Sequence, residues 1–333
     1  MRPVDSLHGT VMVTRDGSVV ADLAGGLADI EAGVPCTSGT RFQLCSVSKQ
    51  FTAAAVLLLV ESGSLDLREP VDRWLPETPP QWRQVTLHHL LSHTAGIPHW
   101  LEAPGLDPAE PMSINQRLEI IQTTPLRTEP GAQWHYSSPG YLLAGFIVER
   151  ASGQPYGEFL AERIMPPLEL TETTVGGVPD AAARGYKDGQ PVAPFELDMM
   201  PGTGDIWSTA RDLTRFTAAL HCGELITTSS LGMMCTAHAC IDDDDDEEPR
   251  LTTTGYGYGM FTGIFAGSAA FYHPGDNPGY QSLACWIPDR AASVVILVND
   301  EATNVTSLLR QLLPAALEPL APAVCSPRTE RSS

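Results

Sequence analysis

The sequence predicts an α+β fold, an antiparallel sheet flanked by helices and built from both termini, with an inserted mostly helical domain. Strand-like segments lie near both ends of the 333-residue chain, and helical patterns fill its middle. Strands and helices do not alternate regularly, as they would in a parallel βαβ sheet. We therefore expect residues 1–65 and 251–333 to form an α/β sheet domain and residues 66–250 a helical domain, with the active site in the cleft between them.

The N-terminal part predicts a hairpin followed by a buried helix. Two apolar runs, residues 9–14 and 18–25, flank Arg15-Asp16-Gly17, and an Asp-Gly turn between such runs is typical of a β-hairpin. Residues 46–62 are apolar nearly all round, which predicts a buried helix that Gly63 ends.

Helical periodicity broken by Pro/Gly loops follows, and strands return at the end. The clearest expected helices cover residues 85–92, 112–123, 140–152, 156–165 and 209–220. Residues 100–111 contain three prolines and are expected to form a loop that borders a cleft. Four strands, at 256–265, 269–273, 281–286 and 292–298, and a helix at 304–317 complete the expected fold.

Composition excludes several classes of partner. The chain is 43% apolar and 18% charged, as in globular proteins, and its net charge of −20 argues against nucleic acid and anionic membrane as partners. Seven consecutive acids at 242–248 predict a solvated loop. No apolar run reaches the roughly 18 residues of a membrane span, and the N-terminus lacks the apolar core of a signal peptide. We expect a cytoplasmic protein.

The seven cysteines are expected to be mostly reduced. Their number is odd and no Cys-x-x-Cys occurs. Cys235, His238 and Cys240 could be drawn as metal ligands, but their spacing is irregular and no fourth ligand is evident, so structural packing is favoured.

Ser46 and Lys49 form the most informative pair. Residues three apart share one face of a helix, so the lysine amine should reach the serine hydroxyl, as nucleophile activation requires. Free N–H groups at the helix start favour developing negative charge. Only two of the 20 basic residues are lysine, Lys49 and Lys187, and arginine could not act as a base. Alone, however, Ser-x-x-Lys also occurs by chance, and a serine here is often a cap.

Two later motifs fit the same chemistry. In Tyr136-Ser137-Ser138, a tyrosine close to a lysine ammonium has its phenolate favoured and could move protons, while Ser138 could bind substrate or Lys49. In His273-Pro274-Gly275-Asp276, Gly275 permits close backbone approach. The N–H groups of Asp276 and Ser46 could form an oxyanion hole. His273 is expected to change charge near neutrality, or else to be a buried neutral residue that holds the strand end.

In this order, the three motifs resemble the serine β-lactamase-related superfamily, in its branch of class C β-lactamases, D,D-peptidases, D-aminopeptidases and family VIII-type esterases. Four stretches carry the resemblance, which covers roughly residues 9–300: 42–52, 90–97, 136–141 and 273–280. It implies that Ser46 is acylated, that Lys49 and Tyr136 handle protons, and that the strand after Gly275 binds substrate backbone. It implies no metal and no cofactor.

Two departures bear on substrate. The second motif usually ends in Asn and here ends in Ser138, and the Lys-Thr-Gly of class C β-lactamases is replaced by His273-Pro274-Gly275. In relatives the Asn amide would hold a substrate side-chain carbonyl, whereas the lysine charge and threonine hydroxyl of Lys-Thr-Gly would recognise a carboxylate. The resemblance therefore points away from efficient β-lactamase activity.

We therefore expect a serine hydrolase that acts through an acyl-enzyme on a small-molecule ester, amide or peptide. An esterase or a D-stereospecific peptidase or amidase is favoured, with weak β-lactamase activity at most. The alternatives are a non-catalytic penicillin-binding-like or sensor protein, and an acyltransferase of secondary metabolism. The sequence does not indicate the oligomeric state.

Overall fold

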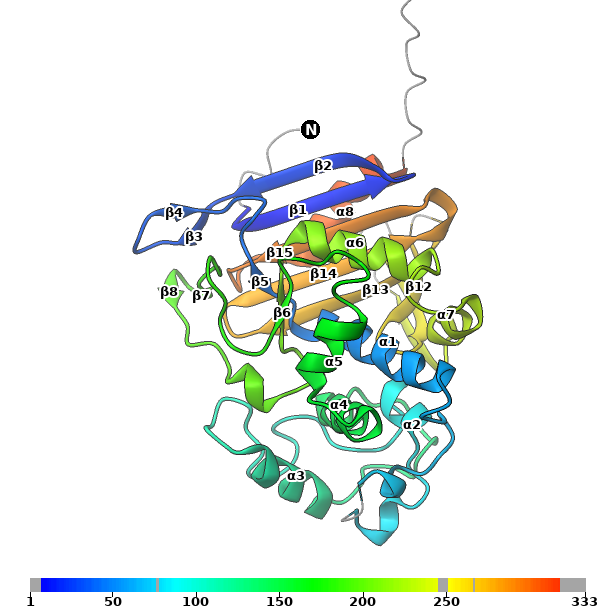
Figure 1. The fold of residues 1–333 in the computed structure, drawn as a ribbon. Coiled ribbons are helices and arrows are strands. Elements are labelled where there is room, and N and C mark those ends of the chain that lie inside the picture. Colours follow the sequence, from blue (N-terminus) through cyan, green and yellow to red (C-terminus); the bar gives the residue numbers. More distant parts are fainter. Residues whose placement is uncertain (1–6, 76–77, 245–250, 266, 318–333) are drawn as a thin grey trace, which may run out of the picture.

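The computed structural model describes residues 7–75, 78–244, 251–265 and 267–317, and it confirms the predicted α+β fold (Figure 1). Its centre is an antiparallel sheet in the order β10-β11-β12-β13-β14-β15-β1-β2. The strands are β1 (Gly9–Arg15), β2 (Ser18–Gly25), β10 (Ala239–Asp244), β11 (Leu251–Tyr256), β12 (Phe261–Phe265), β13 (Ser268–Asn277), β14 (Tyr280–Ile287) and β15 (Ala292–Val298). Both ends of the sequence therefore contribute to one sheet.

The two ends meet where β1 pairs with β15, with Val11 opposite Ile296. Asp16 and Gly17 have positive φ angles of 47° and 72° in the predicted turn between β1 and β2. Every residue of β15 is buried, because successive side chains enter the cores on opposite faces of the sheet. Val295 belongs to one hydrophobic cluster and Ile296 to the other.

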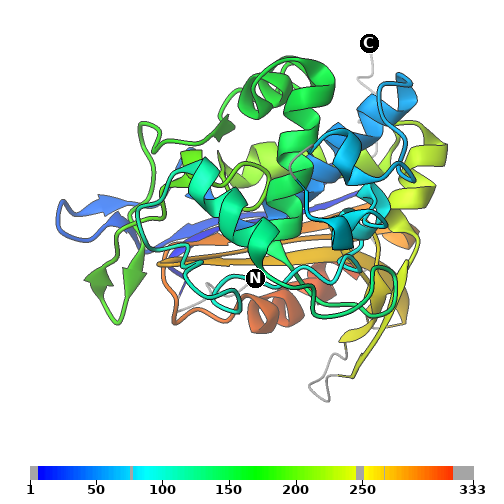
Figure 2. The same cartoon turned by 90° about the horizontal axis from the view of Figure 1, so that it is seen from below.

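Helices cover both faces of the sheet. The C-terminal helix α8 packs on one face, and α6 packs on the other, with α1 and α4 farther out, as Figure 2 shows. The helices are α1 (Ser48–Glu61), α2 (Leu87–Leu91), α3 (Ile114–Thr123), α4 (Ser138–Ser152), α5 (Tyr156–Arg163), α6 (Ala210–His221), α7 (Thr228–Cys235) and α8 (Val305–Leu317). Eleven of the fourteen residues of α1 are buried, as its apolar composition predicted.

Two local expectations were wrong, and one helix was missed. The strand expected over 256–265 is divided between β11 and β12 by a turn at Gly259, whose φ is 72°. Helix α7 was not predicted, because Gly232 lies inside it and weakens the helical pattern. In the acidic run, Asp242–Asp244 belong to strand β10 rather than to a loop, because the backbone pairs with the threonines of β11. The rest of that run lies outside the described residues.

Short strands outside the central sheet complete the structure. Strand β9 (Ile206–Ser208) pairs with both β5 (Phe42–Gln43) and β6 (Thr174–Val175). Two further pairs are β3 (Leu27–Asp29) with β4 (Val34–Pro35), and β7 (Tyr186–Lys187) with β8 (Gln190–Pro191). The proposed division into two domains at residues 65 and 250 stays a prediction. In the described part of the chain, every helix is too short or too polar to cross a bilayer.

Candidate active site

Ser46 lies in a strained turn between β5 and α1. A single 3-10 turn, Cys45–Val47, precedes α1, and the buried Cys45 has a φ of +49°, which is unfavourable for a residue with a side chain. The Ser282 hydroxyl of β14 donates to the Leu44 carbonyl at 2.6 Å and helps to hold the turn. The sheet thus fixes the backbone on which Ser46 stands.

Gly275 allows β13 to pass directly beside this turn. A Cβ atom built on Gly275 would lie 2.7 Å from the Leu44 carbonyl oxygen and 2.8 Å from Cys45 Cβ. These distances leave no room for any side chain, so only glycine permits the approach. Asp276, the next residue, pairs with Gln281 of β14 and lines the same cavity as Ser46. Its role in an oxyanion hole stays a prediction.

Lys49 contacts Ser46 as the spacing predicted. Its Nζ donates to Ser46 Oγ at 3.0 Å and to the Thr203 carbonyl at 2.8 Å. The lysine is completely buried, and burial lowers its pKa from 10.5 to about 7, because an ammonium is poorly solvated there. A lysine with this pKa is partly neutral at pH 7 and can accept a proton.

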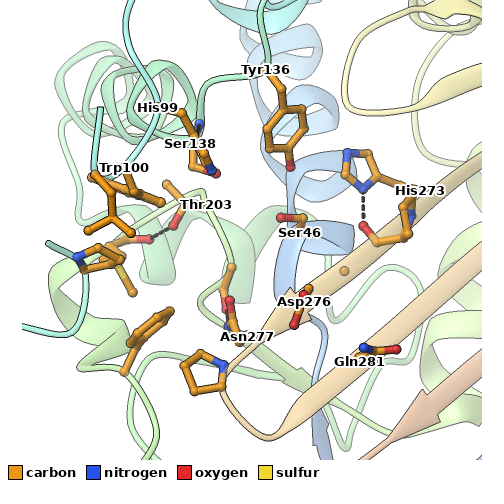
Figure 3. Close-up of a pocket in the computed structure, with 18 of the residues that line it drawn as sticks. Ser46, His99, Trp100, Tyr136, Ser138, Thr203, His273, Asp276, Asn277 and Gln281 are labelled. Carbon is orange, nitrogen blue, oxygen red and sulfur yellow. Dashed lines mark hydrogen bonds between the residues drawn. The ribbon is translucent and has the colours of Figure 1, made fainter. Parts of the chain in front are cut away.

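Tyr136 lies directly before helix α4, where Ser137 caps the Gly140 N–H. Its ring lies 5.1 Å from Lys49 Nζ, and its hydroxyl points toward Ser46 (Figure 3). Burial raises the pKa of Tyr136, although hydrogen bonds with Ser46 and Ser138 oppose the rise. The expected phenolate was therefore wrong, since the desolvation cost outweighs the nearby ammonium. Tyr136 holds its proton at neutral pH.

Ser138 begins helix α4 and is buried. Its backbone N–H donates to His99 Nδ1 at 3.1 Å, and it lines the cavity beside Tyr136. The loop expected at residues 100–111 borders the same cavity through Trp100, Leu101 and Pro108.

His273 is neutral, and the expectation that it changes charge near pH 7 was wrong. Burial and the nearby Lys49 charge lower its pKa to about 3. The Tyr256 hydroxyl lies 3.0 Å from Nε2, and the Pro274 carbonyl lies 2.5 Å from Nδ1. The imidazole therefore carries its proton on Nδ1 and accepts at Nε2. This is the alternative of a buried histidine that holds the strand end.

These residues meet in a cavity of about 750 Å³, shown in Figure 3. The nucleophile candidate Ser46 lies on it, together with Tyr136, Ser138, His273, Gly275 and Asp276, while Lys49 is buried beneath Ser46. Large apolar side chains form much of the remaining wall, including Trp100, Trp134, Phe195, Met200 and Phe261. Of the described residues that line it, Asp276 and Glu301 are acidic and none is lysine or arginine. The cavity therefore suits uncharged or cationic groups better than carboxylates.

Sequence reasoning missed two functional neighbours of this cluster. His93 has a φ of 57°, and its ring centre lies 4.3 Å from that of Tyr136 at a tilt of 44°, and Asp205 is a buried carboxylate near Lys49. His93 stood in a stretch that supported the resemblance without a role. No sequence motif marked Asp205, because only the pairing of β9 with β5 brings it to the site.

Comparisons with known proteins agree with this arrangement. The family described as Beta-lactamase matches residues 5–316. A penicillin-binding protein of Bacillus subtilis (strain 168) is 30% identical over 88% of this chain and 68% of its own length. Esterase EstB of Burkholderia gladioli is 38% identical over 54% of this chain and half of its own length. The crystal structure of D-amino acid amidase from Ochrobactrum anthropi SV3 has a TM-score of 0.79 at 26% identity, covering 92% of this chain and 93% of that one.

Proposed function

This chain belongs to the β-lactamase family, and from that premise we propose that it is a serine hydrolase that cleaves esters or amides through an acyl-enzyme on Ser46. Its similarity to an esterase and to an amidase supports hydrolase activity. The observation that carries the serine mechanism is the 3.0 Å contact between Ser46 Oγ and Lys49 Nζ, at a lysine whose pKa is about 7. An activated serine needs such a neighbouring base.

In the proposed acylation, neutral Lys49 accepts the Ser46 proton while Oγ forms a bond to the substrate carbonyl carbon. The carbonyl electron pair moves onto its oxygen, and the Ser46 and Asp276 N–H groups stabilise that oxyanion. The bond to the leaving group then breaks. Tyr136, which keeps its hydroxyl proton, passes a proton from the Lys49 ammonium to the leaving group.

Deacylation reverses these roles. A water molecule attacks the ester carbon of acyl-Ser46, and the proton that it loses passes through Tyr136 to Lys49. Collapse of the second tetrahedral intermediate returns a proton to Ser46 Oγ and releases a carboxylic acid. Each group ends in its starting protonation state, so the cycle balances.

The walls of the cavity support a substrate with an apolar acyl group and no carboxylate. Aromatic rings of Trp134 and Phe261 line it, and its charged lining residues are acids. His273, neutral at pH 7, offers no positive charge to a carboxylate. We propose small esters as the most readily hydrolysed substrates, D-configured amides or peptides next, and β-lactams last.

The test is steady-state hydrolysis of p-nitrophenyl butyrate by the wild type and by Lys49→Ala. Loss of a general base usually costs about 10²–10⁴-fold, and we expect a kcat/KM decrease in that range. Arg73→Ala is the control, because Arg73 lies at the surface in an ion pair with Glu69 and neither residue lines the cavity. Equal rates for the wild type and Lys49→Ala would contradict the proposal.

A further inference from the structure

Asp205 is a buried carboxylate for which the mechanism above has no use. It is 1% exposed and directly precedes β9, the strand that pairs with β5 just before Ser46. Its Oδ1 accepts the Gly202 N–H at 3.1 Å. A buried carboxylate is costly unless hydrogen bonds or a countercharge stabilise it, so its presence requires an explanation.

The turn that Asp205 closes is attached to helix α1 at two points. The Thr203 carbonyl accepts from Lys49 Nζ at 2.8 Å, and the Gly202 carbonyl accepts from the Thr52 hydroxyl at 2.9 Å. Lys49 and Thr52 lie three residues apart, on one face of α1. Asp205 is therefore hydrogen-bonded to the turn whose Thr203 carbonyl contacts the Lys49 amine.

We propose that Asp205 is a positioning residue that supplies the buried countercharge to Lys49 and so keeps this lysine able to gain and lose a proton during acylation. The inference rests on the proposed function. The two side chains form no direct ion pair within 4.0 Å in the described chain, and the 202–205 turn separates them. Asp205 thus acts across this turn through its field rather than by holding the amine.

The other titratable groups around the pair do not replace this countercharge. Those near Lys49 are Cys45, His93, His99, His273, Tyr136 and Tyr141. Burial keeps the thiol and the phenols protonated and the histidines neutral at pH 7. Near Asp205 are Tyr156, also kept protonated by burial, and the exposed Asp198. Asp205 is the one buried anion that acts on Lys49 among the described residues.

The pKa values of both groups agree with this geometry. Burial raises the pKa of Asp205 from 3.8 to about 7, and the Lys49 charge opposes the rise. Burial lowers the pKa of Lys49, and Asp205 opposes the fall. The two groups thus titrate in the same range, as a coupled pair. Removing the Asp205 charge should lower the pKa of Lys49 further, because its ammonium would lose the one buried countercharge found in the described part of the chain.

Only two lysines occur in the chain, so NMR of protein containing lysine labelled with ¹³C at Cε can follow Lys49 directly and without substrate. Lys187, surface-exposed and paired with Glu301, gives the second signal and an internal reference. We expect the Lys49 signal to titrate near pH 7 in the wild type. In Asp205→Asn, which keeps an acceptor for the Gly202 N–H, its midpoint should fall by about 1–3 pH units. Asp198→Asn removes an exposed charge from the same segment and should match the wild type.

An unchanged or raised Lys49 midpoint in Asp205→Asn would overturn the inference. Should that variant not fold, wild-type protein labelled at aspartate Cγ decides instead. One aspartate signal should then titrate between about pH 6 and 8, far above the ordinary range near 4, and its absence would overturn the inference.

Kinetics give a second readout. The acidic limb of kcat/KM should move to lower pH in Asp205→Asn, with a lower plateau because the base is weaker. A structural defect alone would lower the maximal kcat/KM and leave the pH midpoint of the acidic limb unchanged. The NMR titration needs no turnover, so it can fail while the serine mechanism stands, and the serine mechanism can fail while the titration succeeds.

Discussion

The Tyr256 hydroxyl donates to Nε2 of His273 across 3.0 Å and fixes this imidazole in its neutral form. The other ring nitrogen, Nδ1, donates to the Pro274 carbonyl. A second proton on the ring would therefore have to displace the Tyr256 hydrogen bond in a buried site beside Lys49. His273 therefore lines the active-site cavity as a neutral side chain.

The first prediction concerns the pH dependence of activity. The acidic limb of kcat/KM on a neutral ester should have its midpoint near pH 7, set by Lys49, because His273 titrates at about 3. His273→Gln should keep the same midpoint, even if its rate is lower. A midpoint that moves in His273→Gln would show that the histidine titrates in the working range.

The second prediction concerns Tyr136. Tyr136→Phe keeps the ring that lies 5.1 Å from Lys49 Nζ but removes the hydroxyl next to Ser46 and Ser138. We expect kcat to fall by about 10²–10⁴-fold, as for loss of a proton-transfer group, with little change in stability. Tyr258→Phe, at a hydroxyl that contacts His88, is the control. Activity of Tyr136→Phe within a few-fold of the wild type would exclude the proposed proton relay.

The third prediction concerns β-lactams. The cavity offers no lysine or arginine among its described lining residues, and each missing contact to a carboxylate costs about 1.5–3 kcal/mol. Loss of both the lysine charge and the threonine hydroxyl of Lys-Thr-Gly predicts at least about a hundredfold lower kcat/KM for substrates that carry a carboxylate. Rates on nitrocefin, p-nitrophenyl acetate and p-nitrophenyl butyrate measure it. A higher kcat/KM on nitrocefin than on both esters would contradict the assignment.

The fourth prediction concerns stability in acid. His221 stacks on the rings of Phe271 and Trp286, and burial lowers its pKa from 6.5 to about 3. The unfolded chain binds a proton at His221 below about pH 6.5, whereas the folded chain does so only near pH 3. Protonation therefore favours the unfolded chain, and the free energy of unfolding decreases as the pH falls from 6.5 toward 3. Between pH 7 and 5 the wild type should lose roughly 2 kcal/mol more than His221→Gln. Urea unfolding at both pH values measures the difference, and equal losses would contradict the buried neutral state of His221.

Local patterns in the sequence predicted what depends on neighbouring residues. The Asp16-Gly17 turn and the contact of Lys49 with Ser46 follow from spacing alone. The mostly apolar run at 292–298 predicted a strand, and in the structure it is β15, which is buried on both faces.

What depends on tertiary burial could not be predicted. A single sequence does not show that Tyr136 and His273 are desolvated, so the expected Tyr136 phenolate and the expected titration of His273 near neutrality were both wrong. Asp205 lies near Lys49 only because β9 pairs with β5, across more than 150 residues of sequence. Such contacts carry no local pattern.

Intact-protein mass spectrometry after exposure to a fluorophosphonate tests the central claim most directly. The wild type should gain one adduct, and peptide mapping should locate it on Ser46. Ser46→Ala should gain none, while Ser48→Ala, which changes the buried serine two residues later, should be labelled like the wild type. An adduct on Ser46→Ala equal to that of the wild type would contradict the account.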